Sequence, residues 1–470
     1  MSLSSTEINQ IVEKVVKHLD QDVSDSQSIS KNPAGIFDNL DEAYQAAKEA
    51  QKFLRKLDFR SKAIDAMRTA AKKYAKELAE MAVAETGLGR VDDKIKKKII
   101  QAEKTPGIED LQPIALSGDH GLTLIEQASW GVIASVTPST NPAATIINNA
   151  ISMIAAGNAV LFAPHPSAKK VSQRAITILN EAIASVGGPN SLLTTVTEPT
   201  IEIAQKLFVY PGIDLLVVTG GGAVVKAARD VTDKRLMAAG PGNPPVVVDE
   251  SADISKAAKG IVDGSSFDNN IMCTCEKEII AVDVIADELK SEMSKYGAFE
   301  LDFGQAEKLE KVILKQSPEG KYSVNREWIG KNADLIAKQI GLKVPEGTRL
   351  LFTETKEDHP FAQKELMMPV IPLIRVPDAN SAIDVAVKLE MGNRHTAVMY
   401  SKNLDNLDRM ANEINCSIFV KNGPNYAGLG FGGEGWTSMT ITTPTGEGVT
   451  SARTFVRLRR CVLVDNFRIV

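Results

Sequence analysis

From Gly131 onward, short apolar runs alternate with helical stretches, and this alternation limits the possible folds more than any other feature. GVIASV, NAVLFAP, LLTTV, DLLVVTG and PVVVD are β-rich runs, and helical patterns such as residues 140–155 and 167–186 lie between them. Strands that are apolar throughout are typical of a parallel sheet with helices on both faces. The pattern therefore predicts an α/β fold with a sheet of the nucleotide-binding kind.

A second α/β unit is expected after residue 247. Residues 252–264 are helical in pattern, and EIIAVD, RLLFTET, PVIPLIRV, HTAVMYS and SIFVK are strand-like. Ahead of residue 131, a helix is expected from Asp41 and one long amphipathic helix over residues 61–85, which Gly87 and Gly89 end. Residues 110–130 read as a two-stranded hairpin, and the β-rich residues 450–470 as a terminal strand of the kind that pairs with another subunit.

The N-terminus stands apart from this body. The spacing of the apolar residues in 1–20 predicts one helix with an apolar stripe made of Ile8, Ile11, Val12, Val15, Val16 and Leu19. Residues 21–33 are polar and read as a flexible linker. A helix on such a tether cannot bury its stripe locally, so it is expected to dock on its own body, on a neighbouring subunit or on a separate partner.

Charge and composition exclude several classes of protein. The 470 residues hold 54 Lys and Arg against 59 Asp and Glu, a net charge of -5, so no nucleic-acid partner is expected. The basic run Lys96, Lys97 and Lys98 reads as a solvated helix face. No apolar window is long enough for a membrane span, no secretion signal is evident, and four cysteines are expected to be reduced thiols in the cytoplasm.

The search for catalytic groups leaves one thiol in question. No G-x-S-x-G, H-E-x-x-H or C-x-x-C pattern is present and the five histidines are scattered, so a metal site is not expected. Cys273 follows Asp268, Asn269 and Asn270 at a helix–strand junction, although a Cys beside Met and Ile is more often a buried hydrophobe. Cys275 has the same two readings. The glycine-rich VTGGGAVV and AAGPGNPP either bind a phosphate or make tight turns.

Taken together, long stretches of the chain resemble the aldehyde dehydrogenase superfamily and its CoA-acylating branch. They are TPSTNPAATIINNAISMIAAGNAV, APHPSAKKVS, AAGPGNPP, SFDNN..C..EKEII, IFVKNGPNYAGLG and GGEGWTSMTITTPTGEGVTSARTF. The resemblance covers essentially the whole chain. It is most specific to the acetaldehyde and propionaldehyde dehydrogenases of bacterial microcompartments, of the ethanolamine- or propanediol-utilisation type.

The resemblance implies site residues by position. Cys273 is implied to be the catalytic thiol, Asn141 the oxyanion-hole asparagine, and Glu365, in ELMMPV, the residue that meets the nicotinamide ribose. The other positions implied to bind the cofactor are Thr137, Pro138, Ser139, His165, Thr219, Gly220, Gly221 and Gly240. The implied reaction oxidises a short-chain aldehyde, acetaldehyde or propionaldehyde, with NAD and coenzyme A to acyl-CoA and NADH through a thioester on Cys273.

At two sites the sequence differs from the hydrolytic members of the superfamily, and these differences bear on the reaction and on the cofactor. Ala238 stands where those enzymes have the Glu that activates water, and a CoA thiol is a far better nucleophile than unassisted water. Ala238 therefore favours acyl transfer. In His165-Pro166-Ser167-Ala168 the acidic acceptor for a ribose 2′-hydroxyl is missing, so NAD rather than NADP is expected from the branch alone.

The expected architecture is the aldehyde dehydrogenase fold. A Rossmann-like cofactor domain (31–109 and 131–247) packs on a catalytic α/β domain (248–438), and residues 110–130 and 439–470 form a β oligomerisation element of a homodimer or homotetramer. The resemblance also implies that residues 1–20 dock to the shell or cargo of a cytoplasmic microcompartment. Two alternatives stay open, an NADP-dependent acyl-phosphate reductase of the same superfamily and a non-catalytic scaffold protein.

Overall fold

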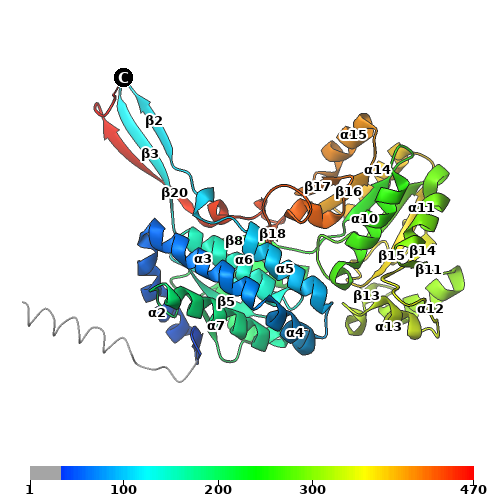
Figure 1. Ribbon diagram of the computed structural model, residues 1–470, viewed down its shortest axis with the longest axis horizontal. Coiled ribbons are helices and arrows are strands. Elements are labelled where there is room, and N and C mark those ends of the chain that lie inside the picture. Colours follow the sequence, from blue (N-terminus) through cyan, green and yellow to red (C-terminus); the bar gives the residue numbers. More distant parts are fainter. Residues whose placement is uncertain (1–32, 470) are drawn as a thin grey trace, which may run out of the picture.

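The computed structural model describes residues 33–469 as two α/β lobes side by side with a thin arm that leaves the first lobe (Figure 1). The expected helix over residues 1–20 and nearly all of the expected linker over 21–33 lie outside the described residues. The C-terminal end of the chain lies at the tip of the arm. Within the described part of the chain, no helix is long and apolar enough to cross a membrane.

The first lobe is built on a six-stranded parallel sheet in the order β1-β6-β5-β4-β7-β8. Its strands are β1 (Ile36–Phe37), β4 (Val132–Thr137), β5 (Ala159–Pro164), β6 (Leu193–Val196), β7 (Leu215–Thr219) and β8 (Arg235–Ala239). Four of them fall on runs that the sequence predicts. The two-residue β1 and the strand β8, which follows Asp233 and Lys234 and begins with Arg235, were not predicted. The predicted parallel α/β arrangement is confirmed for this lobe.

Helices cover this sheet in layers. They are α2 (Leu40–Gln51), α3 (Leu57–Lys73), α4 (Ala75–Thr86), α5 (Val91–Lys104), α6 (Pro142–Ala155), α7 (Lys169–Ser185), α8 (Ile201–Phe208) and α9 (Gly222–Val231). Every residue of α6 is buried, because α6 contacts β4 and β5 on one side and α3 and α5 on the other. The single helix expected over residues 61–85 is instead two, since the backbone at Tyr74 leaves the helical region.

The second lobe has a seven-stranded sheet, also parallel throughout, in the order β11-β14-β15-β10-β9-β16-β17. Its strands are β9 (Pro245–Val248), β10 (Glu278–Val282), β11 (Ala298–Glu300), β14 (Leu350–Thr355), β15 (Val370–Val376), β16 (Thr396–Tyr400) and β17 (Ile418–Lys421). From the sequence, residues 245–247 are expected to belong to the cofactor domain. The structure pairs β9 with β10 and β16 instead, so the chain crosses between the lobes at residues 240–244.

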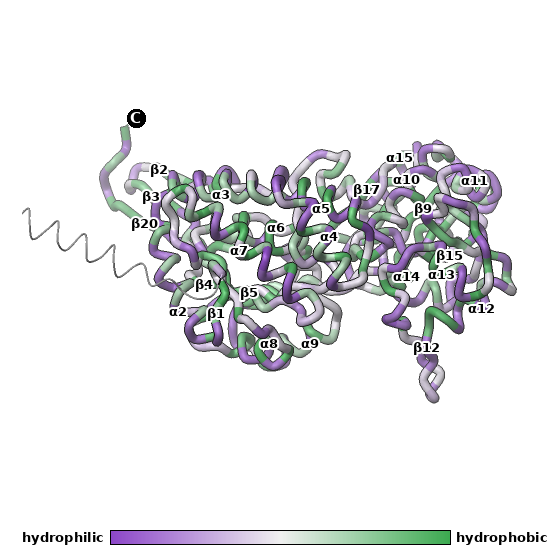
Figure 2. Tube along the Cα trace, turned by 60° about the horizontal axis from the view of Figure 1, so that its bottom comes forward, coloured by the Kyte–Doolittle hydropathy of each residue, from purple (hydrophilic) through white to green (hydrophobic). Residues whose placement is uncertain are grey.

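The helices of this lobe are α10 (Ile254–Ser266), α11 (Asp283–Lys295), α12 (Phe303–Ile313), α13 (Ala333–Lys338), α14 (Ala379–Glu390) and α15 (Leu404–Ile414). In Figure 2 the trace is hydrophobic at the inner strand β9 and mostly hydrophilic over α11, as expected for a covered parallel sheet. The hairpin of β12 (Leu314–Gln316) and β13 (Tyr322–Val324) projects from the lobe.

The arm is an antiparallel sheet of β2 (Ile114–Gly118), β3 (Gly121–Ala128) and β20 (Arg457–Val464). The predicted hairpin and terminal strand are therefore both present, and they pair with each other. The segment between the second lobe and β20, with the short strands β18 (Ile441–Thr442) and β19 (Gly448–Val449), returns to the first lobe. There Ala452 and Phe455 join the core, and Asn158 Nδ2 donates to Phe455 O at 2.9 Å.

Candidate active site

Cys273 lies on a sharply turned loop of the second lobe, between α10 and β10. Three consecutive residues ahead of it, Asp268, Asn269 and Asn270, have positive φ angles of 47°, 55° and 62°. Single Asp or Asn residues tolerate this left-handed region, but three in a row are costly unless their surroundings hold them. The run reverses the chain after α10, and Cys273 is left partly exposed.

The buried side chain of Lys277 holds the Cys273 loop in place by hydrogen bonds. Lys277 Nζ donates to Asn270 O at 2.8 Å, to Asn270 Oδ1 at 2.5 Å and to Met272 O at 3.3 Å. Asn270 Nδ2 in turn donates to Ser265 O and Glu276 O, at 2.7 and 2.9 Å. These contacts fix the backbone on both sides of Cys273, as a preorganised nucleophile requires.

Asn141 belongs to the first lobe, where β4 ends and α6 begins. It occupies the N-cap position of α6, yet its side chain makes no capping hydrogen bond. Its Oδ1 instead accepts a hydrogen bond from Lys97 Nζ, and its Nδ2 donates to Thr140 Oγ1 at 3.3 Å. The amide is therefore oriented by side chains around it and not by the helix that it starts.

Gly242, in the crossing segment, packs against Cys273 and His395. A Cβ atom at Gly242 would lie 2.9 Å from Cys273 O and 2.9 Å from His395 Cγ, so no larger residue fits. His395 is fully buried, its Nδ1 lies 2.9 Å from Thr396 Oγ1, and its Nε2 has no partner among the described residues. Burial and the charge of Lys277 lower the pKa of His395 to about 4, so the ring is neutral at pH 7.

His395 and Lys277 were both missed as site residues. Sequence reasoning treated the histidines as scattered and gave no role to the Lys of EKEII. A signal was present, because each is a polar residue placed directly before a buried strand, β16 and β10. Polar residues in the loops that lead into buried strands often carry function.

Glu365 also lies near the thiol. Burial raises the pKa of this carboxyl group, while Lys277 and a hydrogen bond with the Gly242 backbone lower it. Burial raises the pKa of Cys273 to about 12. The charge of Glu365 adds to this rise, and that of Lys277 opposes it. A raised thiol pKa means that the neutral thiol predominates at pH 7 in the ligand-free protein.

The pH dependence of alkylation checks this assignment. Below its pKa, the thiolate fraction of Cys273 should rise about tenfold per pH unit, and iodoacetamide labelling should rise with it from pH 7 to 10. A Glu365→Gln variant should react faster at any fixed pH, because removing the negative charge lowers the thiol pKa. The exposed Cys461 and the partly exposed Cys416 would also react, so both are replaced by Ser in the background variant. A rate that levels off below pH 8 would contradict the raised pKa.

The other residues singled out in the sequence gather at one edge of the first sheet. Thr137, His165, Thr219 and Gly240 stand at or just after the carboxyl ends of β4, β5, β7 and β8, which are neighbours in the sheet. Pro138 and Ser139 follow Thr137 directly, and Gly220 and Gly221 follow Thr219. The carboxyl edge of a parallel sheet is where nucleotides bind in such folds.

Details of this edge fit a dinucleotide. Thr137 Oγ1 is buried without a partner among the described residues. Gly221 precedes α9, the ten-residue helix whose free N–H groups suit a phosphate, and a Cβ at Gly221 would meet open space. His165 Nδ1 lies 2.8 Å from Ser167 Oγ, and Thr219 Oγ1 lies 3.2 Å from Thr440 Oγ1. No group of three or more candidate metal ligands occurs in residues 33–469.

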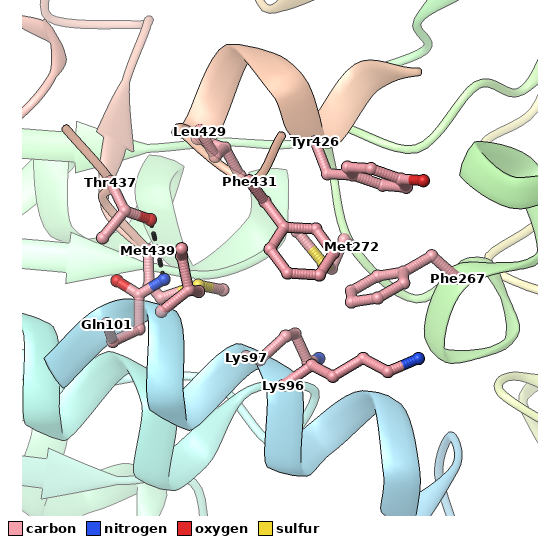
Figure 3. A pocket seen from close by; sticks show the side chains of 11 residues that line it. Lys96, Lys97, Gln101, Phe267, Met272, Tyr426, Leu429, Phe431, Thr437 and Met439 are labelled. Atoms are coloured by element: carbon pink, nitrogen blue, oxygen red, sulfur yellow. Dashed lines mark hydrogen bonds between the residues drawn. The ribbon is translucent and has the colours of Figure 1, made fainter. Parts of the chain in front are cut away.

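A small apolar pocket lies beside the Cys273 loop, where the two lobes meet (Figure 3). Its walls come from α5, from the Cys273 loop between α10 and β10, and from the segment after β17. They are formed by Lys96, Lys97, Ile100, Gln101, Phe267, Met272, Tyr426, Leu429, Phe431, Thr437 and Met439. The rings of Phe267, Tyr426 and Phe431 pack together with centroids 5.1 to 6.0 Å apart. The pocket is small, partly open to solvent and almost entirely apolar, which suits a short aliphatic group.

The lysine run on α5 differs from its expected role. Lys96 is exposed, but Lys97 and Lys98 are buried, so the interpretation of all three as a solvated helix face is wrong. Lys97 is buried because it pairs with the buried Asp268 on the Cys273 loop. Asp268 also pairs with Lys94, one turn earlier on α5. A sequence shows three consecutive lysines on a helix but not the carboxylate that faces Lys97.

Comparison with known proteins identifies the family of this chain. The model of the aldehyde dehydrogenase family matches residues 20–440, which is most of the chain. The chain belongs to the aldehyde dehydrogenase family. The superfamily resemblance inferred from the sequence is therefore confirmed, and so is the fold class.

Relatives within the aldehyde dehydrogenase family match over nearly the full length. An acetylating acetaldehyde dehydrogenase of Escherichia coli is 61% identical over 469 residues, covering 100% of both chains. A CoA-propanoylating propanal dehydrogenase of Citrobacter freundii is 46% identical over 93% of this chain and 94% of that protein. The structure of a propionaldehyde dehydrogenase of Rhodopseudomonas palustris with bound CoA and an acylated cysteine has a TM-score of 0.89 and 44% identity, and covers 92% of this chain and 99% of that chain.

Proposed function

We propose that the protein oxidises a short-chain aldehyde, acetaldehyde or propionaldehyde, with NAD and CoA to acyl-CoA and NADH, and that the reaction is reversible. The observation that carries the proposal is a partly exposed Cys273, on a loop fixed by Lys277, with Ala238 in place of a water-activating base. The relatives named as acetylating and CoA-propanoylating enzymes support it.

The first half-reaction begins at Cys273. Its thiolate adds to the aldehyde carbon, and the carbonyl oxygen becomes an oxyanion. The side-chain amide of Asn141 and the backbone N–H of Cys273 are suited to stabilise this charge, because both are held in place before the substrate arrives. The oxyanion then collapses to a carbonyl as the aldehyde hydrogen leaves the carbon as hydride, and NAD bound at the carboxyl edge of the first sheet, with Glu365 at its ribose, would be the acceptor. Cys273 then carries the acyl group as a thioester.

The second half-reaction needs a nucleophile that takes the acyl group from Cys273. Ala238 is fully buried in β8 and its methyl group cannot activate water. The thiol of CoA attacks the thioester carbon, the bond to Cys273 Sγ breaks, and Cys273 leaves as the thiolate. The Nε2 atom of His395, which has no partner among the described residues, is the proposed acceptor of the CoA thiol proton, and the lowered pKa of His395 makes it a weak base that releases this proton readily. The CoA-dependent rate of a His395→Gln variant tests that role.

The assay that tests the proposal follows NADH formation from acetaldehyde, propionaldehyde and butyraldehyde, each with and without CoA. We expect strict dependence on CoA, acyl-CoA as the product, and faster turnover of the two shorter aldehydes because the pocket is small. Equal rates without CoA, with free acid as the product, would overturn the argument from Ala238. Reduction of an acyl phosphate without any use of CoA would favour the acyl-phosphate reductase alternative.

NAD is proposed as the preferred dinucleotide on the strength of the family branch. Residues 165–168 offer His165, which is exposed enough to reach a ribose, but no carboxylate for a 2′-hydroxyl. The pair of KM values for NAD and NADP in the same assay decides this preference.

Assembly is the remaining part of the proposal. The arm exposes the large apolar side chains of Ile114, Leu116, Leu458, Val462, Leu463 and Val464, which a solvated monomer would rarely leave open. We propose that the arm joins subunits into a homodimer or homotetramer, and that residues 1–20 dock the enzyme to the shell or cargo of a bacterial microcompartment. Light scattering of the full chain decides the first point, and co-sedimentation with shells the second.

A further inference from the structure

Helix α5 places three lysine side chains in the interior, which is unusual because lysine is almost never buried without a partner. Lys94, Lys97 and Lys98 are 2%, 3% and 2% exposed. Lys94 Nζ donates to Asp268 Oδ2 and to Thr140 O, each at 3.1 Å. Among residues 33–469, Lys98 Nζ donates only to a carbonyl of its own helix, Lys94 O, at 3.3 Å.

Lys97 alone among these three contacts a side chain of the proposed oxyanion site. Its Nζ donates to Asn141 Oδ1 and to Asp268 Oδ2. An ammonium group has donors and no acceptor, so it can face only the oxygen of the Asn141 amide, and this fixes the orientation of that amide. The amide nitrogen must then point away from Lys97. Thr140 Oγ1 takes one of its two N–H groups, and the second is left for a substrate oxygen.

We propose that Lys97 is a positioning residue of the oxyanion site, whose ammonium holds the side-chain oxygen of Asn141 and so turns an amide N–H toward the aldehyde oxygen on Cys273. This inference rests on the proposed function and deepens it. Lys97 also lines the apolar pocket beside Cys273 (Figure 3), which places it within the site and not merely beneath it.

The position of Asn141 in its helix supports this role. Asparagine is among the most favoured N-cap residues because its side-chain oxygen accepts a backbone N–H of the first turn. Asn141 occupies that position in α6 but makes no such bond, since Lys97 takes the oxygen. Helix α6 therefore lacks this stabilising side-chain cap, which fits a role for the Asn141 amide at the oxyanion site.

Lys97 is itself held by the Cys273 loop. Asp268 is fully buried, and its other oxygen, Oδ1, accepts the Arg90 backbone N–H at 2.7 Å. A Cβ at Gly89 would lie 2.0 Å from Asp268 Oδ1, so the packing around this carboxylate is close. Asp268 begins the left-handed run that leads to Cys273. Lys97 therefore connects Asn141 of the first lobe to the loop that carries Cys273 in the second.

A double-mutant cycle in the full-length protein tests the proposal with acetaldehyde, CoA and NAD. Lys97→Met should lower kcat about 10- to 100-fold, since a misplaced donor loses much of its effect, and should leave the KM for NAD within about threefold. Adding Lys97→Met to Asn141→Ala should cost less than about threefold more, because the lysine acts through a group already removed. Losses that multiply, or an unimpaired Lys97→Met variant, would overturn the proposal.

Two further variants separate positioning from folding. Lys98→Met removes a lysine that is equally buried on the same helix but does not touch Asn141, and it should keep kcat within about threefold. Lys97→Gln retains an N–H donor without the charge and should recover part of the activity lost in Lys97→Met. If Lys97→Met fails to fold, as thermal unfolding would reveal, the cycle is run with Lys97→Gln and is judged by the same test of additivity.

The cycle also separates this inference from the proposed function. Full activity in Asn141→Ala would refute the oxyanion role of Asn141. An impaired Asn141→Ala beside an unimpaired Lys97→Met would leave that role intact and refute only the positioning by Lys97.

Discussion

Replacing Cys273 by Ala should lower kcat about 10⁴-fold or more, because no acyl intermediate can form without the thiol and removal of a covalent nucleophile has effects of this size. NADH formation from acetaldehyde with CoA measures the loss. When the variant is incubated with labelled aldehyde and then denatured, residue 273 should carry no labelled acyl group. Binding of NAD should persist, since Cys273 lies on the second lobe and the proposed dinucleotide edge on the first.

Cys275 offers a matched control for the same experiment. It lies two residues along the same loop but is fully buried, with its Sγ 3.8 Å from Phe267 O. Cys275→Ala should therefore retain kcat within about fivefold, as expected for a small change at a packed position. The assignment of the nucleophile would be wrong if Cys275→Ala abolished turnover while Cys273→Ala did not.

Asn141→Ala should lower kcat about 10²- to 10³-fold, the usual effect of removing one oxyanion-hole donor. The KM values for aldehyde and CoA should change much less, because the charge that the amide stabilises develops only after the substrate is bound. Steady-state kinetics with acetaldehyde, CoA and NAD provide both numbers.

The isosteric Asn141→Asp variant sharpens this second test. It keeps the shape of the side chain and retains a partner for Lys97, but it places a negative charge where a negative charge develops. We expect it to be at least as slow as Asn141→Ala. A variant with normal kcat and a raised KM would show that Asn141 binds the ground state only, which contradicts the oxyanion role.

Most strands of the two sheets could be predicted because parallel strands buried on two faces appear as continuous apolar runs, whereas β1, β8 and β11 are too short or too polar at one end to stand out. The sheet to which a strand belongs could not be predicted. PVVVD has the same composition as the strands of the first lobe, yet β9 pairs with β10 and β16 of the second, since its partners lie far away in sequence. Similarly, nothing local marks Tyr74 as the break between α3 and α4.

The residues of the candidate site, like the strands, could be predicted only in part. Cys273 and Asn141 were predicted by resemblance to a family, and the structure adds the contacts that hold them, although their catalytic roles stay predictions. Lys277 and Lys97 could not be predicted, because a buried lysine and a solvated one look alike in a sequence. Their burial depends on distant oxygens, those of Asp268, Asn270 and Asn141, which only the folded chain brings together.

The return of the chain to the first lobe has a consequence for synthesis. The second lobe is inserted between β8 and the segment that contributes Ala452 and Phe455 to the core of the first. A ribosome therefore completes every strand of the first sheet long before it makes the residues that close that core. Until then the nascent first lobe exposes the Asn158 amide and the apolar surface that Phe455 covers, which is the kind of surface that chaperones bind. Insertion of the second lobe therefore makes maturation of the first lobe depend on residues that are translated after the second lobe.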